Sequence, residues 1–207
     1  MKYIVAVDQS TSASKIFLVD ERGEITRTAR HAHRQLYPVP GRAEHDAEEI
    51  YQCVKAGIDE VIEGVERTQI NAIALTNQRE TIVVWERTTG QPVCPAIVWQ
   101  DTRGTLICAE LISANDRVQQ LTGSALSPYL PASKATQLLR EQPWLLARAE
   151  NGDLCIGTIE SYLIFRMCGR FASDYSNASR TQWFDLHTRD WSSELLSLFG
   201  MPRAALA

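Results

Sequence analysis

The stretch YIVAVDQSTSASKIFLV, residues 3–19, decides the fold. Its apolar beginning and its apolar end are each typical of a short strand, and the small polar residues between them are typical of a tight turn. A second turn at 20–23 leads into residues 24–33, which predict a third strand. The chain is therefore predicted to open with an antiparallel meander of three strands.

The remainder of the chain alternates between helix and strand patterns. Asp46 is a favourable N-cap, and apolar residues then recur at helical spacing from Ile50 to Val65. Runs rich in β-branched residues predict a buried strand at 70–75 and further strands at 81–85 and 96–99. Helical spacing predicts helices at 105–112, 116–121, 133–139, 144–149 and 158–167. Without a repeat or a linker, we expect a single α/β domain with a mixed sheet, flanking helices and an inserted helical portion.

The composition favours small molecules or proteins as partners. The 207 residues are 44% hydrophobic and carry a formal net charge of -4, without the basic run that nucleic acid or an anionic membrane requires. No apolar segment approaches ~18 residues, so no membrane span is expected. Five scattered cysteines without a C-x-x-C pair disfavour disulfides or a zinc site and indicate buried thiols in a reducing cytoplasm.

The turn after the first strand is the first candidate site. Asp8 ends that strand, where a carboxylate can orient magnesium or its water. Thr11 and Ser12 can offer hydroxyls and backbone N–H groups to a phosphate, and Lys15 can add a positive charge. An ordinary turn rich in serine and threonine fits the same residues, so both interpretations stay open on the spacing alone.

Three further polar segments follow predicted strands or helices. Arg79 and Glu80 offer a donor fork and an acceptor suited to polyol hydroxyls, although on the residues alone a solvated surface pair explains them better. Trp99 offers an apolar wall to the C–H face of a small carbohydrate, and a core tryptophan is an equally good interpretation. The polar residues at 173–180 are interpreted as a structured loop with a scaffold role.

Taken in order, these strings resemble the FGGY carbohydrate kinases, and among them the glycerol kinases. The series covers essentially the whole chain. Its members are YIVAVDQ at 3–9, YP at 37–38, EHD at 44–46, TNQRET at 76–81, AIVWQ at 96–100, PY at 128–129, SK at 133–134, GT at 157–158 and NASRT at 177–181. The resemblance implies the N-terminal domain of a sugar kinase with a ribonuclease-H-like, actin-like ATPase fold.

The resemblance also implies roles for the candidate residues. Arg79, Glu80 and Tyr129 would contact the hydroxyls of the acceptor, and Trp99 would line the same pocket. The hairpin at 8–15 would face the phosphates of ATP, and its aspartate would position Mg²⁺. The γ-phosphoryl group would pass to a primary hydroxyl. The expected partners are a small polyol or sugar and ATP, without nucleic acid or membrane, and a homo-oligomer is left open.

The sequence departs from the family pattern at several positions. Ser10 stands where the hairpin usually has glycine, Lys15 where glycerol kinases commonly have arginine, and Ser127 where they carry aspartate. The family's general base, an aspartate in a Gly-Asp-Gln motif, is expected beyond Ala207, as is the C-terminal nucleotide-binding domain. We therefore expect residues 1–207 to be an incomplete FGGY kinase N-terminal domain that does not turn over alone.

Other functions stay open at this point. The acceptor could be another polyol or a ketose, and a truncated pseudokinase or binding protein would keep the acceptor contacts without phosphoryl transfer. A ribonuclease-H-like nuclease would use clustered carboxylates and a basic surface, which the acidic net charge of -4 opposes.

Overall fold

The computed structural model describes residues 2–207, which fold as two compact units. The first unit contains residues up to Gln35 together with Asp46–Gln78, and the second contains Leu36–His45 and Arg79–Ala207. The sequence indicated one domain with an inserted helical portion, whereas each of the two units has a sheet of its own. Hydrophobic periodicity locates strands along the chain but does not tell which strands share a sheet.

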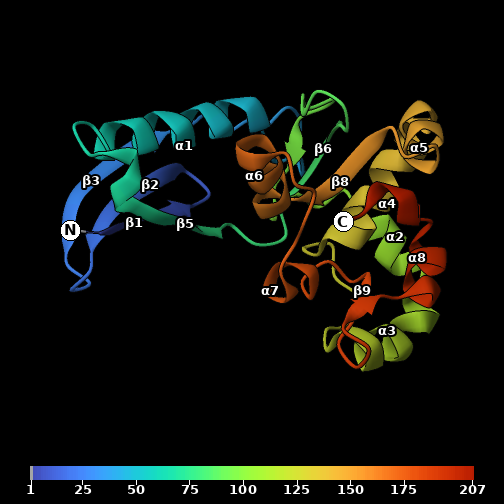
Figure 1. Cartoon of the computed structure of the whole chain (residues 1–207). Coiled ribbons are helices and arrows are strands. Elements are labelled where there is room, and N and C mark those ends of the chain that lie inside the picture. The colour runs from blue at the N-terminus through green and yellow to red at the C-terminus, as the bar shows by residue number, and fades with distance from the viewer. Residues whose placement is uncertain (1) are drawn as a thin grey trace. The chain divides into compact units, whose positions relative to one another are not determined.

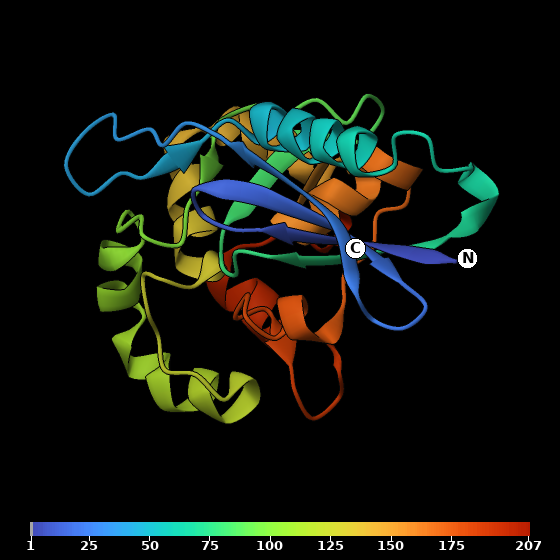
Figure 2. The same ribbon diagram turned by 90° about the vertical axis from the view of Figure 1, so that its left-hand side faces the viewer.

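The first unit is a four-stranded sheet with a helix along one face (Figures 1 and 2). Its elements are β1 (Tyr3–Gln9), β2 (Ala13–Asp20), β3 (Ile25–Ala32), α1 (Ala47–Val61), the 3-10 turn η1 (Arg67–Gln69) and β5 (Ile70–Asn77). The strands lie in the order β3-β2-β1-β5. The first three pair antiparallel, which confirms the predicted meander, and β5 runs parallel to β1, so the sheet is mixed as expected.

Helix α1 begins where the sequence predicted. The carboxylate of Asp46 accepts hydrogen bonds from the backbone N–H groups of Glu48 (2.9 Å) and Glu49 (3.1 Å), which satisfies two donors of the first turn. The buried face of the helix packs on β2 and β3. Gly57 lies on this face, and a Cβ there would clash with Ile16 of β2. The missing side chain therefore lets the helix approach the sheet closely.

Strand β5 differs from the prediction of a buried strand. Ile73 is 46% exposed, and Ala72 and Ala74 are exposed as well. Strand β5 is exposed because it is an outer strand of the sheet among the described residues and because α1 packs mainly on β2 and β3. An apolar run predicts a strand but not how much of its surface the fold will cover.

The second unit is built on another four-stranded sheet, which is antiparallel throughout. Its strands are β4 (Glu44–His45), β6 (Ile82–Glu86), β7 (Ala96–Ile97) and β8 (Leu154–Thr158), in the order β4-β7-β6-β8. Its helices are α2 (Thr105–Glu110), α3 (Asn115–Thr122), α4 (Pro131–Glu141), α5 (Pro143–Glu150), α6 (Ile159–Cys168), α7 (Tyr175–Ala178) and α8 (Ser193–Phe199). The smaller elements are the 3-10 turns η2 (Ile112–Ala114) and η3 (Arg203–Ala205) and the hairpin β9 (Phe184–Asp185) and β10 (Asp190–Trp191).

The five helices predicted beyond Asp101 are confirmed as α2 to α6, with ends that differ by a few residues. Thr158 was predicted to begin a helix, but it ends β8 and caps α6, because its hydroxyl accepts from the N–H of Ser161. Strand β8 was not predicted. It is only five residues long and includes Gly157, which weakens the β pattern.

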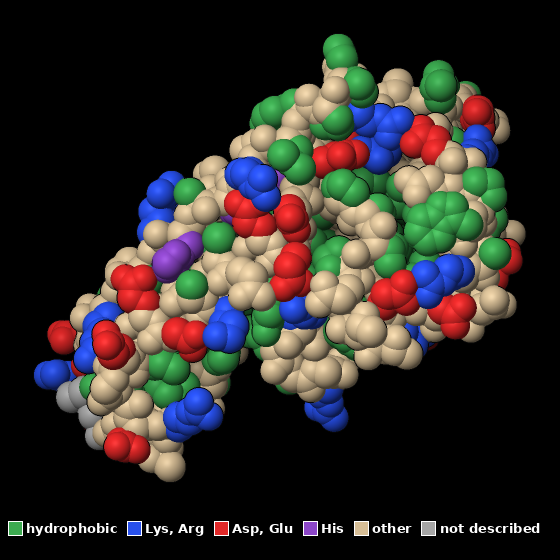
Figure 3. Space-filling model, turned by 90° about the horizontal axis from the view of Figure 1, so that it is seen from above, with side chains coloured by type: hydrophobic (Ala, Val, Ile, Leu, Met, Phe, Trp, Pro, Cys, Tyr) green, Lys and Arg blue, Asp and Glu red, His purple; other side chains and the backbone are tan. Residues whose placement is uncertain are grey.

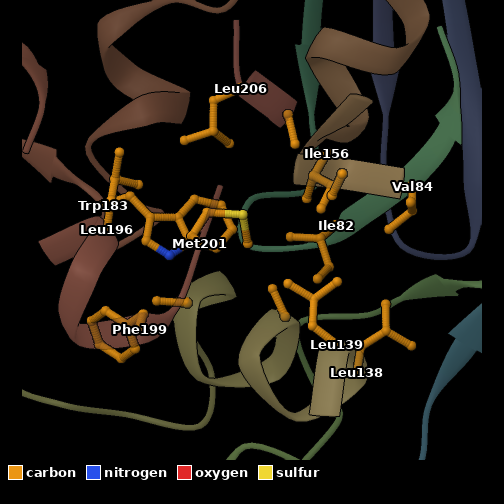
Figure 4. Packing of buried hydrophobic residues seen from close by; sticks show 14 of the residues in the cluster. Ile82, Val84, Leu138, Leu139, Ile156, Trp183, Leu196, Phe199, Met201 and Leu206 are labelled. Carbon is orange, nitrogen blue, oxygen red and sulfur yellow. The ribbon is translucent and has the colours of Figure 1, made fainter. Parts of the chain in front are cut away.

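The hydrophobic core of the second unit lies between the sheet and the helices (Figure 4). Ile82 and Ile156 come from the neighbouring strands β6 and β8, and Leu138 and Leu139 come from α4. Each side chain buried in this way stabilises the fold by roughly 1.5–3 kcal/mol. The core therefore fixes β6 and α4, which begin within two residues after Glu80 and Leu130 of the site described below.

Charged groups of both signs are interspersed in small clusters over the surface seen in Figure 3. The cysteines are free thiols, but only Cys155 is buried and Cys168 is exposed, so the expectation of buried thiols is corrected. Cys168 is the last residue of α6. Within residues 2–207, no helix has the length and apolar character that crossing a bilayer requires.

Candidate functional site

A hollow of about 510 Å³ opens on the second unit. It is lined by Glu80, Trp99, Ser124, Ala125, Ser127, Tyr129, Leu130 and Arg180. Three of the four residues predicted to bind an acceptor are in this set, and they come from three separate segments of the chain. The structure thus brings Glu80, Trp99 and Tyr129 together around one concave surface of a size suited to a small ligand.

Two aromatic rings form the apolar wall of the hollow. Trp99 and Tyr129 are stacked, with ring centroids 5.8 Å apart and an angle of 22° between the ring planes. The backbone N–H of Trp99 donates to the hydroxyl of Thr81 at 3.2 Å, which ties the segment after β7 to the start of β6. Trp99 is only half-buried, so the alternative of a core tryptophan does not hold. Such a wall suits the C–H face of a polyol or sugar.

Glu80 supplies the acidic group of the hollow. Its side chain is 17% exposed, and its Oε1 accepts a hydrogen bond from Nε of Arg180 at 2.7 Å. Arg180, the partner of Glu80, belongs to the loop at 173–180, for which the sequence predicted only a scaffold role. The polar character of that loop did not indicate that one of its residues would line a binding site. Glu80 has a φ of 62°, a left-handed conformation that costs a residue with a side chain about 1–2 kcal/mol. Backbone strain of this kind is concentrated at functional sites.

Arg79 lies beside this acidic group in sequence but has a different contact. Nη2 of Arg79 donates to the hydroxyl of Ser176 in α7 at 3.3 Å. Arg79 is not among the described residues that line the hollow, and its contact with Ser176 is separate from the contact of Glu80 with Arg180. Both contacts lead to the loop at 173–180.

The loop at 173–180 is structured, as predicted. Asp174 caps α7, and its carboxylate accepts from the N–H of Asn177 at 2.6 Å. The buried Glu160 of α6 holds the start of the loop through the hydroxyl of Ser173 (3.1 Å) and the N–H of Asp174 (3.2 Å). Burial, together with the nearby charge of Asp174, raises the pKa of Glu160 above its ordinary range. This loop positions Arg180 at the hollow.

Lys134 of α4 lies beneath the same segments. Its side chain is fully buried, and Nζ donates to the carbonyl oxygens of Glu80 (2.8 Å), Val98 (3.1 Å) and Tyr129 (2.8 Å). Burial lowers the pKa of Lys134 to about 7. The sequence showed this residue only as part of the family resemblance. A usable signal was its place four residues before Leu138, on the apolar face of a predicted helix.

A second buried ionic cluster holds β4 near the end of β7. Nη2 of Arg103 lies 2.7 Å from Asp101 and 2.7 Å from Glu44. The side chains of Arg103 and Asp101 are 4% and 0% exposed. Although burial opposes it, the hydrogen bonds from Arg103 and from the N–H of Ala43 hold the pKa of Asp101 below its ordinary value. Asp101 and Arg103 thus link the segment after β7 to Ala43 and Glu44.

The hairpin predicted to face phosphates lies in the first unit. Asp8 of β1 pairs with Lys15 of β2, and side chains alternate between faces, so both lie on the face opposite α1. The hydroxyl of Ser10 donates to Oδ1 of Asp8 at 2.9 Å. Between the strands, Thr11 is held through its carbonyl by the side-chain amide of Gln35 at 2.6 Å, and Ser12 is exposed.

The hairpin residues fit a magnesium site of the kind that keeps water and phosphate ligands. Among residues 2–207 no group of three His, Cys, Asp or Glu side chains could hold a metal ion by itself. Mg²⁺ is commonly bound by one or two carboxylates plus the oxygens of a phosphate substrate. Asp8, with its hard oxygen donors at the end of β1, suits such a shared site.

Fold and site together define the class. An antiparallel meander joined to a parallel strand, with a second α/β unit carrying a polar hollow, is the actin-like fold of the sugar kinases. The model of the FGGY family of carbohydrate kinases, N-terminal domain, matches residues 3–207. The chain belongs to the FGGY family of carbohydrate kinases.

Individual relatives agree with this membership. A glycerol kinase of Janthinobacterium sp. (strain Marseille) is 42% identical over 209 residues, which cover 99% of this chain and 42% of the relative. An apulose kinase of Pectobacterium atrosepticum is 40% identical over 98% of this chain and 42% of its own length. The crystal structure of Plasmodium falciparum glycerol kinase with ADP has a TM-score of 0.89 and 32% identity, over 97% of this chain and 41% of that chain. The chain thus spans less than half the length of these relatives.

Proposed function

We propose that the full-length protein is an ATP-dependent kinase that phosphorylates a primary hydroxyl of a polyol, with glycerol as the first candidate. The observation that carries this proposal is the convergence of Glu80, Trp99 and Tyr129 on one hollow in a chain of the FGGY family. Residues 1–207 would be its acceptor-binding N-terminal domain. The general base and a C-terminal nucleotide-binding domain would lie beyond Ala207. A cytoplasmic location and a homo-oligomer stay predictions.

The hollow supplies the groups that a polyol needs. The Glu80 carboxylate accepts hydrogen bonds from vicinal hydroxyls, and such charge-assisted bonds are the stronger ones. The stacked rings of Trp99 and Tyr129 contact the carbon chain. Arg180, and Arg79 from its position next to Glu80, offer donors to the hydroxyl oxygens. Fixing the acceptor in this way contributes to the rate because the reacting hydroxyl is held in one orientation.

The hairpin of the first unit would face the nucleotide. Thr11 and Ser12 would donate to phosphate oxygens, Lys15 would neutralise their charge, and Asp8 would hold Mg²⁺ or its water. The metal, when bound, would reduce the negative charge that opposes phosphoryl transfer. Ser10 in place of glycine adds a Cβ at this turn, and Lys15 supplies a point charge where arginine would supply a fork.

A second candidate acceptor is a ketose. The apulose kinase relative is as similar in coverage as the glycerol kinase relative, and the hollow of about 510 Å³ exceeds what glycerol alone would fill. Ser127, which lines the hollow, is smaller than the aspartate that glycerol kinases carry there. The two acceptors are distinguished by competition, in which dihydroxyacetone or a pentulose either does or does not displace glycerol from the purified protein.

Substitution of Glu80 tests the proposed function. In the full-length protein, Glu80→Gln should lower kcat/KM for the acceptor by roughly 10- to 100-fold, because a charge-assisted hydrogen bond becomes a neutral one. The control is Glu194→Gln, whose carboxylate is 51% exposed in an ion pair with Arg117 on the surface. Unchanged kcat and KM in Glu80→Gln would refute the acceptor site.

A turnover assay tests the proposed division of labour between the two parts of the kinase. Residues 1–207 alone should not phosphorylate glycerol, since the general base is proposed to lie beyond Ala207. ATP-dependent phosphorylation by these residues alone would refute that placement. A full-length protein that binds glycerol and never turns over would instead indicate a pseudokinase.

A further inference from the structure

Lys134 connects the three segments that form the hollow. Its ammonium donates to the carbonyl oxygens of Glu80, Val98 and Tyr129, at 2.8, 3.1 and 2.8 Å. Glu80 and Tyr129 line the hollow themselves, and Val98 directly precedes Trp99, which also lines it. Segments that are far apart in sequence therefore meet at one nitrogen atom.

The three contacts match the chemistry of the ammonium group. Lysine has three N–H donors and no acceptor, and each of the three carbonyls accepts one bond. The side chain is 0% exposed, so water cannot replace a lost partner. The charged groups that influence Lys134 are Asp101 and Glu80, which favour its charged form, and Arg103, which opposes it.

The contact to Glu80 is made at the strained backbone. Glu80 has a φ of 62°, and its carbonyl is one of the three that Lys134 holds. A residue stays in such a conformation only when its surroundings fix it. The backbone direction at this residue decides where the carboxylate enters the hollow.

We propose that Lys134 is a positioning residue of the acceptor site, which fixes the backbone at Glu80, Val98 and Tyr129 so that the side chains of Glu80, Trp99 and Tyr129 converge on one hydroxylated ligand. The inference rests on the proposed function for the identity of the ligand. On this inference, the buried side chain of Lys134 in α4 determines how the three ligand-facing residues are placed relative to one another.

The test compares Lys134→Met with Thr136→Val, two substitutions on the same helix. Methionine keeps the length of lysine and removes all three donors. Thr136→Val removes a buried hydroxyl within hydrogen-bonding distance of the carbonyls of Ala132 (2.8 Å) and Phe199 (2.7 Å), which lie outside the lining of the hollow. Both variants should lose stability, so Thr136→Val controls for a general effect on the fold. Lys134→Gln, which keeps two donors on a shorter chain, is the second variant if Lys134→Met is not recovered folded.

Amide hydrogen exchange, read by mass spectrometry on peptides, reports the positioning directly. We expect faster exchange in Lys134→Met at 79–81, 98–100 and 127–130, and unchanged exchange there in Thr136→Val. The KM for glycerol should rise roughly tenfold or more in Lys134→Met while the KM for ATP is unchanged. The measurements are made about one pH unit below the pKa of Lys134, so that its side chain stays charged in the unaltered protein.

The outcomes separate the two proposals. Unchanged exchange in the three segments, or equal acceleration in Thr136→Val, would overturn the role of Lys134. The exchange result does not depend on glycerol, so it decides that role even in a protein that binds another ligand. Failure of the unaltered protein to bind glycerol would overturn the proposed acceptor and not the positioning role of Lys134.

Discussion

Nε of Arg180 lies 2.7 Å from Oε1 of Glu80, a contact between residues one hundred positions apart in the chain. The arginine is 45% exposed and the glutamate 17%, so the pair lies at the wall of the hollow and not in the core. The contact holds one oxygen of the Glu80 carboxylate, and both residues line the hollow. We expect this ion pair to affect ligand binding more than the stability of the fold, because partly exposed ion pairs stabilise folds by at most about 1 kcal/mol.

Arg180→Met should therefore weaken acceptor binding with little effect on folding. We expect glycerol affinity to fall roughly 3- to 10-fold, since the carboxylate of Glu80 loses the partner that orients it, with the free energy of unfolding changed by less than about 1 kcal/mol. Calorimetric titration and urea unfolding measure the two quantities. Arg117→Met is the matched control, because Arg117 is 50% exposed and pairs with Glu194 on the surface. Equal glycerol affinity in both variants would contradict the role of Arg180.

Arg103→Met should destabilise the second unit strongly. The substitution leaves the buried carboxylate of Asp101 without its charged partner and removes the link to Glu44, which costs about 3–5 kcal/mol for a buried pair. Arg140→Met breaks an ion pair whose members are 52% and 53% exposed and should cost less than about 1 kcal/mol. Urea unfolding followed by tryptophan fluorescence measures both. A loss of stability in Arg103→Met no larger than in the control would show that the cluster is not a structural one.

The stability of the first unit should decrease in mild acid because of His33. Burial lowers the pKa of His33 below its ordinary value of 6.5, although its surroundings at Thr11 and Glu49 oppose the shift. Below 6.5 the unfolded chain therefore binds more protons than the folded chain, so stability is complete above that pH and falls as the pH drops toward the folded pKa.

Chemical unfolding at pH values on either side of this window measures the effect of His33. The limiting slope for one proton is about 1.4 kcal/mol per pH unit. His33→Gln should remove this part of the pH dependence, and substitution of the exposed His187 by Gln should leave it in place. An identical pH dependence in all three proteins would contradict the prediction.

Substitution of Lys15 tests the phosphate side of the proposed site. Lys15 is exposed on β2 and pairs in register with Asp8. In the full-length protein, Lys15→Met should raise the KM for ATP roughly tenfold without changing the KM for glycerol, because one charge near the phosphates is lost. Lys15→Arg should stay near the unaltered value. Lys55→Met, on the exposed side of α1, is the control. A higher KM for glycerol in Lys15→Met would place this residue at the acceptor instead.

The local patterns of the sequence were good predictors of elements. Periodicity and turn chemistry act over a few residues. They were enough to predict the meander at 3–33, the cap at Asp46 and the helices after Asp101. Two-residue strands such as β4 and β7 could not be predicted beyond the apolar run at 96–99, because a pair of residues becomes a strand only through its partner. The exposure of β5 likewise depends on where α1 lies.

The ordered strings at residues 3–181 identified, without a structure, both the family resemblance and the candidate residues Asp8, Arg79, Glu80 and Trp99, because residue type and order belong to the sequence. Only the tertiary structure decided that Glu80 pairs with Arg180 and that a buried Lys134 holds three segments of the hollow. The physical reason is distance along the chain. Contacts between residues 54 and 100 positions apart form when sheets and helices pack, and no local pattern specifies them.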